Sequence, residues 1–431
     1  MAGRQTRRQS TEDQRYRGNI GRFYCFMALI GFQFFLPIWV IFLREERGLR
    51  LEQITALEAP LWLTAVLLEA PTGAVADRWG RKFSLCCGAA LLALGLFVFG
   101  VATAYPLLFA SYLIFGAAIT LFSGADAAFF YDTLKALGRA DEYQRLYGRA
   151  WAIQSGAMSC GLLLGAPLAR LTTLQTPVLC STVVAALAFG VALTLREPPR
   201  FDDGAERPGL VRGMRLAAGL VWRTPGIRFM VPLASAVVAG AGVLQLLIQP
   251  FLRRHEVDIA FFGVLLLPSD VGGLATALLA HRVVAVVGLR TVMIGLPALI
   301  LGALLVFAVW DAVWALVWYP AAGVAVATVR TLVSDYHNQR VPSAQRATVL
   351  SFQQLVSSLL FVPVAPLAGL VGDRLGLPAG YLAVAGVVAL VAAPALALWL
   401  RATGPPGAAD DRDKGKQSVA EPRTAVDRTV S

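Results

Sequence analysis

The sequence has few of the residues that build metal centres, disulfide frameworks or charged water-soluble surfaces. Its 431 residues include three histidines and five cysteines, and only 15% of them are charged. The cysteines show no paired spacing, so we expect neither a metal site nor a disulfide framework, and no cofactor. Soluble domains carry about a quarter charged residues. This composition therefore excludes an ordinary water-soluble enzyme.

The sequence is rich in long apolar runs. Apolar residues make up 57% of the chain, and the mean hydropathy is +0.64. A helix needs about 20 apolar residues to cross the hydrocarbon core of a bilayer. Runs of this kind lie near 19–43, 52–75, 83–104, 106–130, 147–169, 174–195, 227–252, 258–281, 288–309, 312–334, 346–371 and 378–400. We therefore predict an all-α integral membrane protein with twelve transmembrane helices.

The longest polar gap divides these runs into two sets of six. It contains Pro198, Pro199 and Pro208 among mixed charges, which is typical of a solvated linker. The halves also resemble each other weakly, because Arg149 and Arg346 each open the fifth run of their half. Repeated six-helix halves are a common transporter design, with the binding site between them. The predicted segments are an N-terminal tail (1–18), a first six-helix bundle (19–195), a linker (196–226), a second six-helix bundle (227–400) and a disordered tail (401–431).

Basic residues concentrate in every second gap between the runs. The formal net charge is +11, and most of it lies in the N-terminal tail, the linker and the gaps near 78–82 and 135–145. The gaps near Tyr105 and Trp310 contain no basic residue. Because basic loops remain on the cytoplasmic side, we predict that both chain termini are cytoplasmic. Charge confined to short gaps is not typical of a nucleic-acid-binding surface.

A short segment between the second and third runs carries a distinctive set of glycines and charges. Its fixed positions are Gly73, Asp77, Arg78, Gly80, Arg81 and Lys82. Gly73 permits a neighbouring helix to approach closely, and Gly80 permits a tight turn. Asp77 is an anion suited to the positive N-terminus of another helix. The basic residues favour the cytoplasmic side.

This segment resembles the signature loop of the major facilitator superfamily, Gly-x-x-x-Asp-Arg-x-Gly-Arg-Lys, at every fixed position, and the likeness in layout covers nearly all of 19–400. The resemblance implies two pseudo-symmetric bundles of six helices. It also implies a cytoplasmic gate in which Asp77 and its basic neighbours latch the halves together. Our preferred partner is the start of the eleventh helix, where Ser343 is a candidate N-cap. The alternative is that the segment only fixes topology and packing.

Two further stretches, near 123–135 and 335–348, resemble a bacterial branch of drug and multi-substrate transporters. That resemblance implies efflux across the cytoplasmic (inner) membrane of a bacterium, and we expect a monomer. The sequence departs from the branch at Ala127, where the branch often has a second acid. The resemblance therefore carries over no role that needs paired acids.

Ionisable side chains inside transmembrane runs are costly and mark functional sites. Asp270 lies near the middle of the eighth run, and Asp126 lies in the inner half of the fourth. Because burial favours a protonated carboxylic acid, both residues are candidates for proton coupling. The alternative for each is an ion pair or a helix cap. Arg330 of the tenth run could pair with Asp126 across the halves.

The substrate cavity is expected among the first, fourth, seventh and tenth helices, as in the family that the sequence resembles. The candidates are Gln33 and Phe35 in the first, Gln245 and Gln249 on one face of the seventh, and Arg330 in the tenth. Amides among aromatic rings suit an amphipathic organic molecule better than a sugar. The alternative for the glutamines is hydrogen bonding between helices.

These patterns predict a secondary active transporter that works by alternating access, and not an enzyme. The sequence lacks the Gly-x4-Gly-Lys-Ser/Thr pattern of a phosphate-binding loop, so we expect an ion gradient to drive transport. We expect proton-coupled export of a small amphipathic compound, whose partners are protons and the lipid bilayer. One alternative is a facilitator or symporter that imports a small solute. Another is a membrane-embedded enzyme or sensor, which three histidines at run ends disfavour.

Overall fold

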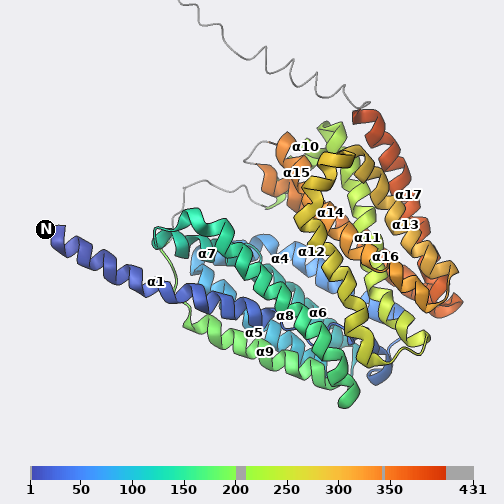
Figure 1. Ribbon diagram of the computed structural model, residues 1–431, viewed down its shortest axis with the longest axis horizontal. Helices are drawn as coiled ribbons and strands as arrows, with labels where there is room; N and C mark the ends of the chain where they lie inside the picture. The colour runs from blue at the N-terminus through green and yellow to red at the C-terminus, as the bar shows by residue number, and fades with distance from the viewer. Residues whose placement is uncertain (1, 200–209, 342–344, 404–431) are drawn as a thin grey trace, which may run out of the picture.

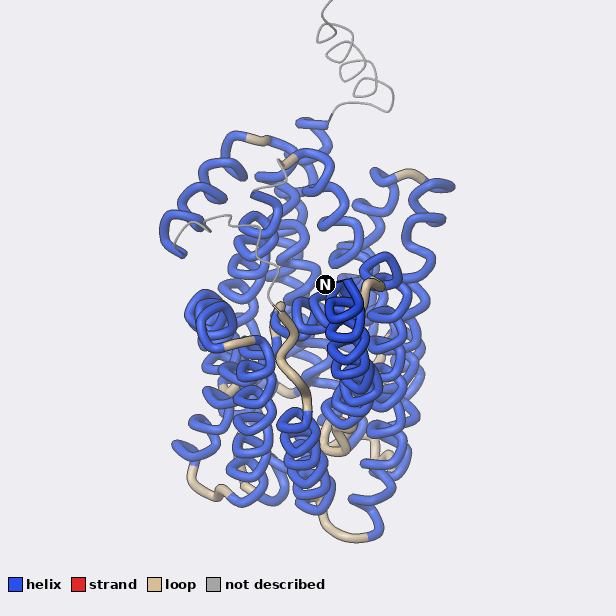
Figure 2. Tube along the Cα trace, turned by 90° about the vertical axis from the view of Figure 1, so that its left-hand side faces the viewer, coloured by secondary structure: helices blue, strands red, loops and turns tan. Residues whose placement is uncertain are grey.

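The computed structural model describes residues 2–199, 210–341 and 345–403. Within these residues every regular element is helical, as Figure 2 shows. Eleven helical segments are long and apolar enough to cross a membrane. The remaining predicted span, near 19–43, is divided, because its helix ends at Gly31 and resumes at Trp39. The prediction of an all-α protein with twelve transmembrane helices is confirmed.

The first half of the chain forms one bundle. Its helices are α1 (Ala2–Gly31), α2 (Trp39–Ile41), α3 (Leu51–Ala56), α4 (Glu58–Trp79), α5 (Arg81–Val101), α6 (Tyr105–Phe122), α7 (Ala125–Ala136), α8 (Tyr143–Leu171) and α9 (Gln175–Thr194). The predicted second span consists of α3 and α4. The predicted fourth span is also two helices, α6 and α7, which are joined at Gly124 with a left-handed φ of 74°.

The second half forms the other bundle. Its helices are α10 (Leu210–Arg223), α11 (Pro225–Arg254), α12 (Phe262–Val287), α13 (Leu289–Val309), α14 (Pro320–Thr328), α15 (Ser334–Arg340), α16 (Arg346–Leu375) and α17 (Leu377–Thr403). The tenth span combines α14, a π-helical turn and α15. Part of the predicted linker (200–209) and most of the predicted tail (404–431) lie outside the described residues.

Figure 1 shows the two bundles meeting at the lower right of the view and diverging toward the upper left. The first bundle packs around Phe23, Phe26, Phe129 and Phe130, and the rings of Phe23 and Phe130 lie 4.6 Å apart. The second bundle is built around α11, the most deeply buried of the candidate spans. The core of the second bundle is continuous with buried residues of the first, such as Phe42 and Phe99, so the two bundles share part of their packed interior.

Small residues allow the helices to approach one another closely. Gly323 of α14 lies against the backbone of Ser269 in α12, and its N–H donates to Ser269 Oγ at 3.0 Å. Between the bundles, Gly263 of α12 lies against the carbonyl of Leu162 in α8. A side chain at either glycine would collide with backbone. Because lipid tails are as apolar as leucine, close packing of this kind holds membrane helices together.

We name the two ends of the molecule by the segments that they carry. The linker face carries the α4–α5 turn at Gly80 and the chain that follows α9 from Leu195. The far face carries the connection before α3 at Arg50, the connection after α8 at Thr172 and the end of α16 at Leu375.

Polar contacts hold the two bundles together at the far face. They are the ion pairs of Arg253 Nε with Glu45 Oε1 (2.6 Å) and of Arg170 Nε with Asp258 Oδ2 (3.2 Å), and the hydrogen bond from the Glu52 N–H to Asp373 Oδ2 (2.9 Å). Toward the linker face, α16 meets α4 through Ser351 Oγ and Glu69 Oε1 at 3.4 Å. The far face is thus closed by bridges between the bundles.

Asp258 makes two contacts at the far face. Its Oδ1 accepts a hydrogen bond from the Ala260 N–H at 2.9 Å, and its Oδ2 pairs with Arg170. The backbone hydrogen bond first, and then Arg170, favour the carboxylate and lower the pKa of Asp258. The bridge is therefore fully present above the ordinary pKa of an aspartate, and it is lost as the pH falls through the lowered value.

Gln249 of α11 supports the break in the first span. Its Oε1 accepts from the Val40 N–H at 3.0 Å, and its Nε2 donates to the Leu36 carbonyl at 2.8 Å. Non-helical backbone at membrane depth needs such partners, because lipid offers none. Gln249 is buried. Its contacts are the hydrogen bonding between helices that the sequence analysis gave as the alternative to a cavity role.

The predicted linker contains a helix, α10, which packs against α16 and α11. Its sequence is strongly amphipathic. Ala217 and Val221 are buried, whereas Arg215, Trp222 and Arg223 are exposed. The apolar face is covered by the second bundle, so this part of the linker is structured rather than merely solvated.

We expect Gln249→Leu to lower the thermal unfolding temperature of the purified protein. The substitution leaves the buried Val40 N–H and the partly buried Leu36 carbonyl without this partner, and loss of a partner by a buried group costs about 1–3 kcal/mol. Gln245→Leu is the matched control, because Gln245 lies one turn away and is exposed. Equal unfolding temperatures for the two variants in a fluorescence-monitored melt would contradict the role of Gln249.

Candidate functional site

The turn between α4 and α5 is held by a carboxylate that the sequence analysis did not identify. Gly80 has a φ of 111°, a conformation that side chains disfavour. The two carboxylate oxygens of Glu197, which follows α9, accept from the Arg81 N–H (2.8 Å) and the Lys82 N–H (2.7 Å). These are free amide groups at the start of α5, where negative charge is favoured. Glu197 therefore caps α5.

The side chain of Arg81 anchors the same turn to α7. It forms an ion pair with Asp132 and donates to the Ala128 carbonyl at 2.8 Å. Asp132 is 3% exposed. The sequence analysis predicted a gating role for Arg81 but gave no partner for it. In the structure Arg81 joins α5 to α7 within the first bundle.

The other predicted gating residues lie at the linker face. Asp77 and Arg78 are exposed, and Lys82 is half-buried. A Cβ atom at Gly73 would meet no other atom within 4 Å, so the close helix approach expected there is absent from this conformation. The candidate N-cap Ser343 lies outside the described residues. The latch between Asp77 and the start of α16 therefore stays a prediction.

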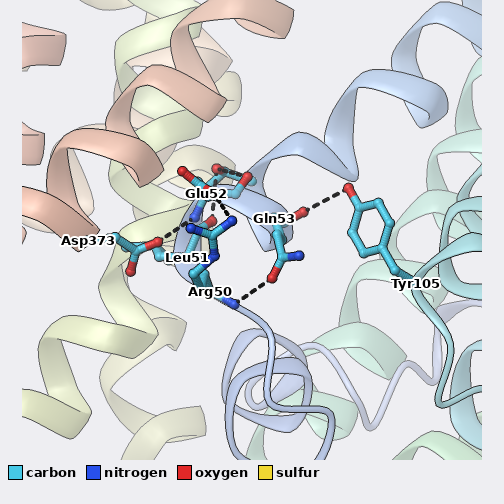
Figure 3. Close-up of polar contacts among 7 residues, drawn as sticks. Arg50, Leu51, Glu52, Gln53, Tyr105 and Asp373 are labelled. Atoms are coloured by element: carbon cyan, nitrogen blue, oxygen red, sulfur yellow. Dashed lines mark hydrogen bonds and ion pairs between the residues drawn. The ribbon is translucent and has the colours of Figure 1, made fainter.

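The end of α16 repeats part of the same pattern at the far face. Residues 369–376 read Gly-x-x-x-Asp-Arg-x-Gly, as residues 73–80 do. Here Asp373 Oδ2 accepts from the Glu52 N–H in the first turn of α3 (Figure 3). A Cβ at Gly369 would collide with the Leu51 carbonyl. Sequence reasoning missed this contact, although the repeated spacing was a signal that could have found it.

A cavity of about 330 Å³ lies between the bundles. The first bundle contributes residues of α2 and α4, and the second contributes residues of α11, α14 and α16. The described lining residues are Trp39, Glu58, Trp62, Val238, Gly242, Gln245, Leu246, Val326, Gln354, Ser357, Ser358 and Phe361. Ligand sites in proteins have this size and this mixture of aromatic walls and few polar groups.

Glu58 is the one ionisable side chain among the described residues that line this cavity. It is the first residue of α4, and its Oε2 accepts from Trp62 Nε1 at 3.0 Å. Trp62 in turn meets Phe361 of the second bundle edge-on, with ring centroids 6.4 Å apart. The sequence analysis gave no site role to Glu58, because a single acid near a run end has no distinctive pattern.

The predicted cavity residues fall into different surroundings. Gln245 lines the cavity, and Gln249 is in the contact between the bundles described above. Gln33 Nε2 donates to the Ile30 carbonyl at 3.3 Å, and Phe35 packs against Phe99. Only Gln245, of these four candidates, is among the described lining residues.

The predicted pair of Asp126 and Arg330 does not form among the described contacts. Asp126 accepts from the Tyr147 hydroxyl at 3.0 Å and from the Ala127 N–H at 2.6 Å. The Arg330 guanidinium lies over the Trp151 ring, 5.5 Å from its centroid, and this contact crosses between the bundles. Asp126 therefore has a hydroxyl partner within its own bundle.

Asp270, the second proton-coupling candidate, lies on α12 and is half-buried. Its neighbour Ser269 receives the hydrogen bond from Gly323 of α14. No metal-binding group of three or more His, Cys, Asp or Glu residues occurs in the part of the chain that the structure describes.

A family model described as Major Facilitator Superfamily matches residues 23–365 of the chain. No match was found among curated protein sequences. Several solved transporter structures share the fold. The nucleoside transporter NupG is 15% identical and has a TM-score of 0.74, and the alignment covers 88% of this chain and 98% of NupG.

Two further structures are similar over comparable lengths. A bacterial homologue of the human lysosomal transporter Spinster, in an inward-facing and unoccupied conformation, is 17% identical, with a TM-score of 0.65 and coverage of 91% of this chain and 99% of its own. A POT family transporter in complex with a thioalcohol-conjugated peptide is 10% identical, with a TM-score of 0.65 and coverage of 89% and 96%. At these identities the likeness establishes the fold alone.

We expect Asp132→Asn to destabilise the first bundle. Removing the carboxylate leaves the Arg81 charge uncompensated, and because the Arg81 side chain is 22% exposed we expect a cost below the about 3–5 kcal/mol of a fully buried pair. Glu142→Gln is the control, because Glu142 also pairs with arginines, Arg139 and Arg145, but these two side chains are 42% and 63% exposed. The thermal unfolding temperature should fall for Asp132→Asn and change little for Glu142→Gln. The same small change in both would show that the Arg81 ion pair contributes little.

Proposed function

Because the chain belongs to the Major Facilitator Superfamily, we propose that it exports a small amphipathic organic compound in exchange for protons. The family and the fold are those of transporters rather than enzymes. The observation that carries the proposal is the cavity between the bundles, which lies beneath a closed far face. Alternating access requires such a site, shared by two halves that can rock about it.

The charge distribution supports placing the linker face in the cytoplasm. At the far face, Arg170, Arg253 and Arg254 are each paired with a carboxylate. The linker face carries the arginines of the signature turn and of α10, together with the basic N-terminal segment. Basic residues are retained on the cytoplasmic side of bacterial inner membranes. In this orientation both termini are cytoplasmic, and the structure corresponds to a state closed toward the outside.

Asp126 and Asp270 remain our candidates for proton coupling. Intramembrane carboxylates with polar neighbours are typical of proton relays. The hydrogen bond from Tyr147 gives Asp126 a partner that can serve both its charged and its protonated forms. A proton moving down a membrane potential releases about 2.3 kcal/mol per 100 mV, which can drive export.

A facilitator or symporter that imports a solute is the second candidate. A nucleoside transporter is among the solved structures with the same fold. Identity of 15% does not extend from fold to direction or substrate. The two functions differ in the sign of the coupling between proton flux and substrate flux, so an experiment on this coupling separates them.

We expect Asp126→Asn to abolish the pH dependence of transport without unfolding the protein. The amide cannot exchange a proton, but it can still accept a hydrogen bond from Tyr147. The measurement is substrate-induced proton flux in proteoliposomes that contain a pH-sensitive dye, screened over a panel of amphipathic compounds. Antiport moves protons against the direction of the compound, whereas symport moves them with it.

The control variant is Asp141→Asn, which removes an exposed carboxylate in the turn before α8. Its proton flux should match that of the unmodified protein. An unaltered pH profile in Asp126→Asn would remove this residue from the coupling path. Proton flux in the direction of the substrate would overturn export in favour of the symporter.

A further inference from the structure

We propose that the cavity binds a monovalent organic cation with an aromatic or apolar body, and that Glu58 contacts its charge. This inference rests on the proposed transport function and names a substrate class for it. Among the described lining residues there is one carboxylate and no arginine, lysine or histidine. The charge of the site is therefore that of a single acid.

The Glu58 carboxylate has little to balance it within the protein. Its only hydrogen bond from the described residues is the one from Trp62 Nε1, and these residues form no ion pair with it. Transferring an unpaired carboxylate out of water is expensive unless a cation or hydrogen-bond donors compensate it. A cationic ligand supplies that compensation, whereas an anionic ligand would be repelled.

The aromatic side chains around Glu58 suit the apolar body of such a cation. Trp39 and Trp62 come from the first bundle and Phe361 from the second, and all three line the cavity. Aromatic faces attract organic cations through their negative electrostatic potential. Gln245 adds a neutral amide that can orient a polar substituent. The combination of one acid and several aromatic rings favours an apolar monocation over a sugar or a zwitterion.

Two ions of the same shape and opposite charge test the proposal directly. Tetraphenylphosphonium and tetraphenylborate are titrated calorimetrically into the purified full-length protein, with protein-free micelles as the blank. We expect the phosphonium to bind and the borate not to bind. Glu58→Gln should weaken phosphonium binding by roughly tenfold or more, while Asp141→Asn should leave it unchanged.

If Glu58→Gln does not fold, two further variants test the same site. Glu58→Asp retains the charge and should retain most of the binding. Trp62→Leu removes an aromatic face and should weaken phosphonium binding several-fold. Equal binding of the two ions, or phosphonium binding that is indifferent to Glu58 and Trp62, overturns the proposal.

Failure of this inference is distinguishable from failure of the proposed function. If proteoliposomes exchange protons for another compound but the phosphonium does not bind, the cation site is wrong and transport stands. If the phosphonium binds through Glu58 but no compound is transported, the site stands and the transport proposal fails.

An independent observation carries a second inference, which concerns the two copies of the Gly-x-x-x-Asp-Arg-x-Gly pattern. We infer that residues 369–376 form a far-face latch, the counterpart of the linker-face latch predicted for residues 73–80. The helices α3 and α4 run from the far face to the linker face, and α16 runs in the opposite direction. The far-face copy therefore ends α16 beside the start of α3, and the linker-face copy ends α4 at the face where α16 begins.

The far-face copy is engaged in this structure. Asp373 accepts the hydrogen bond from the Glu52 N–H, an amide in the first turn of α3. Gly369 packs directly against the same turn, where a Cβ would collide with backbone. Figure 3 shows Asp373 beside Leu51 and Glu52. A carboxylate at a helix N-terminus satisfies an amide and meets the positive end of the helix dipole.

The linker-face copy lacks the close helix approach seen at the far face, because no atom lies within 4 Å of the place where a Cβ of Gly73 would stand. If the bundles rock about the cavity, Gly369 and Asp373 separate from α3 and the far face opens. The far-face latch therefore stabilises the conformation that is closed at this face.

Spin-label distances measure this exchange without any substrate. In a variant that lacks the native cysteines, one label pair reports the far face (Thr173 and Trp310) and another the linker face (Asp141 and Gln339). We expect Asp373→Asn to lengthen the far-face distance and to shorten the linker-face distance. The ratio of the two populations should change by roughly tenfold, as expected for the loss of a helix cap.

Arg374→Gln is the matched control, because it alters the charge of the same segment without removing the carboxylate that contacts α3. A population ratio that is the same in Asp373→Asn and in the unmodified protein overturns the far-face latch. An equal shift in Arg374→Gln would also overturn it, because the effect would then be one of net charge.

Discussion

Much of this structure depends on one kind of contact, in which a carboxylate from one segment of the chain caps the N-terminus of a helix in another segment. Glu197 caps α5, and Asp373 caps α3 across the two bundles. The first amides of a helix have no partner within the helix, and lipid cannot provide one. Caps from elsewhere in the chain therefore fix how helices meet. A cap within a bundle makes it rigid, whereas a cap between bundles can open and close.

The scarcity of hydrogen-bond partners in lipid also explains why polar residues of similar type have different roles. Gln249 is buried where the first span is broken, because exposed backbone there needs both a donor and an acceptor. Gln245, one turn earlier, faces the cavity and is available to a ligand. The Glu58 carboxylate lies in a cavity whose described walls contain no cation. Whether a glutamine stabilises the helix packing or lines the cavity therefore depends on the groups that surround it.

Much of the architecture could be predicted from the lengths of the apolar runs alone, because the thickness of a bilayer sets a minimum length for each transmembrane helix. The breaks at Gly31 and Gly124 and the helix α10 were not predicted. Hydropathy averages over some twenty residues, so it does not register a local interruption that another helix compensates. For the site, the signature turn was recognised, but its partners Glu197 and Asp132 were not. They are distant from the turn in sequence, and neither the linker around Glu197 nor the stretch around Asp132 indicates which residue it contacts.

The sequence by itself determined that the chain crosses a membrane many times as two related halves. Each apolar run is long enough to span the hydrocarbon core of a bilayer. It also carried both copies of the glycine–aspartate pattern. Only the tertiary structure decided that Asp373 of the second copy contacts α3, and that Glu58 rather than Gln249 lines the space between the bundles. These outcomes depend on how two packed bundles are tilted against each other, and a rigid-body tilt leaves no mark in the local sequence.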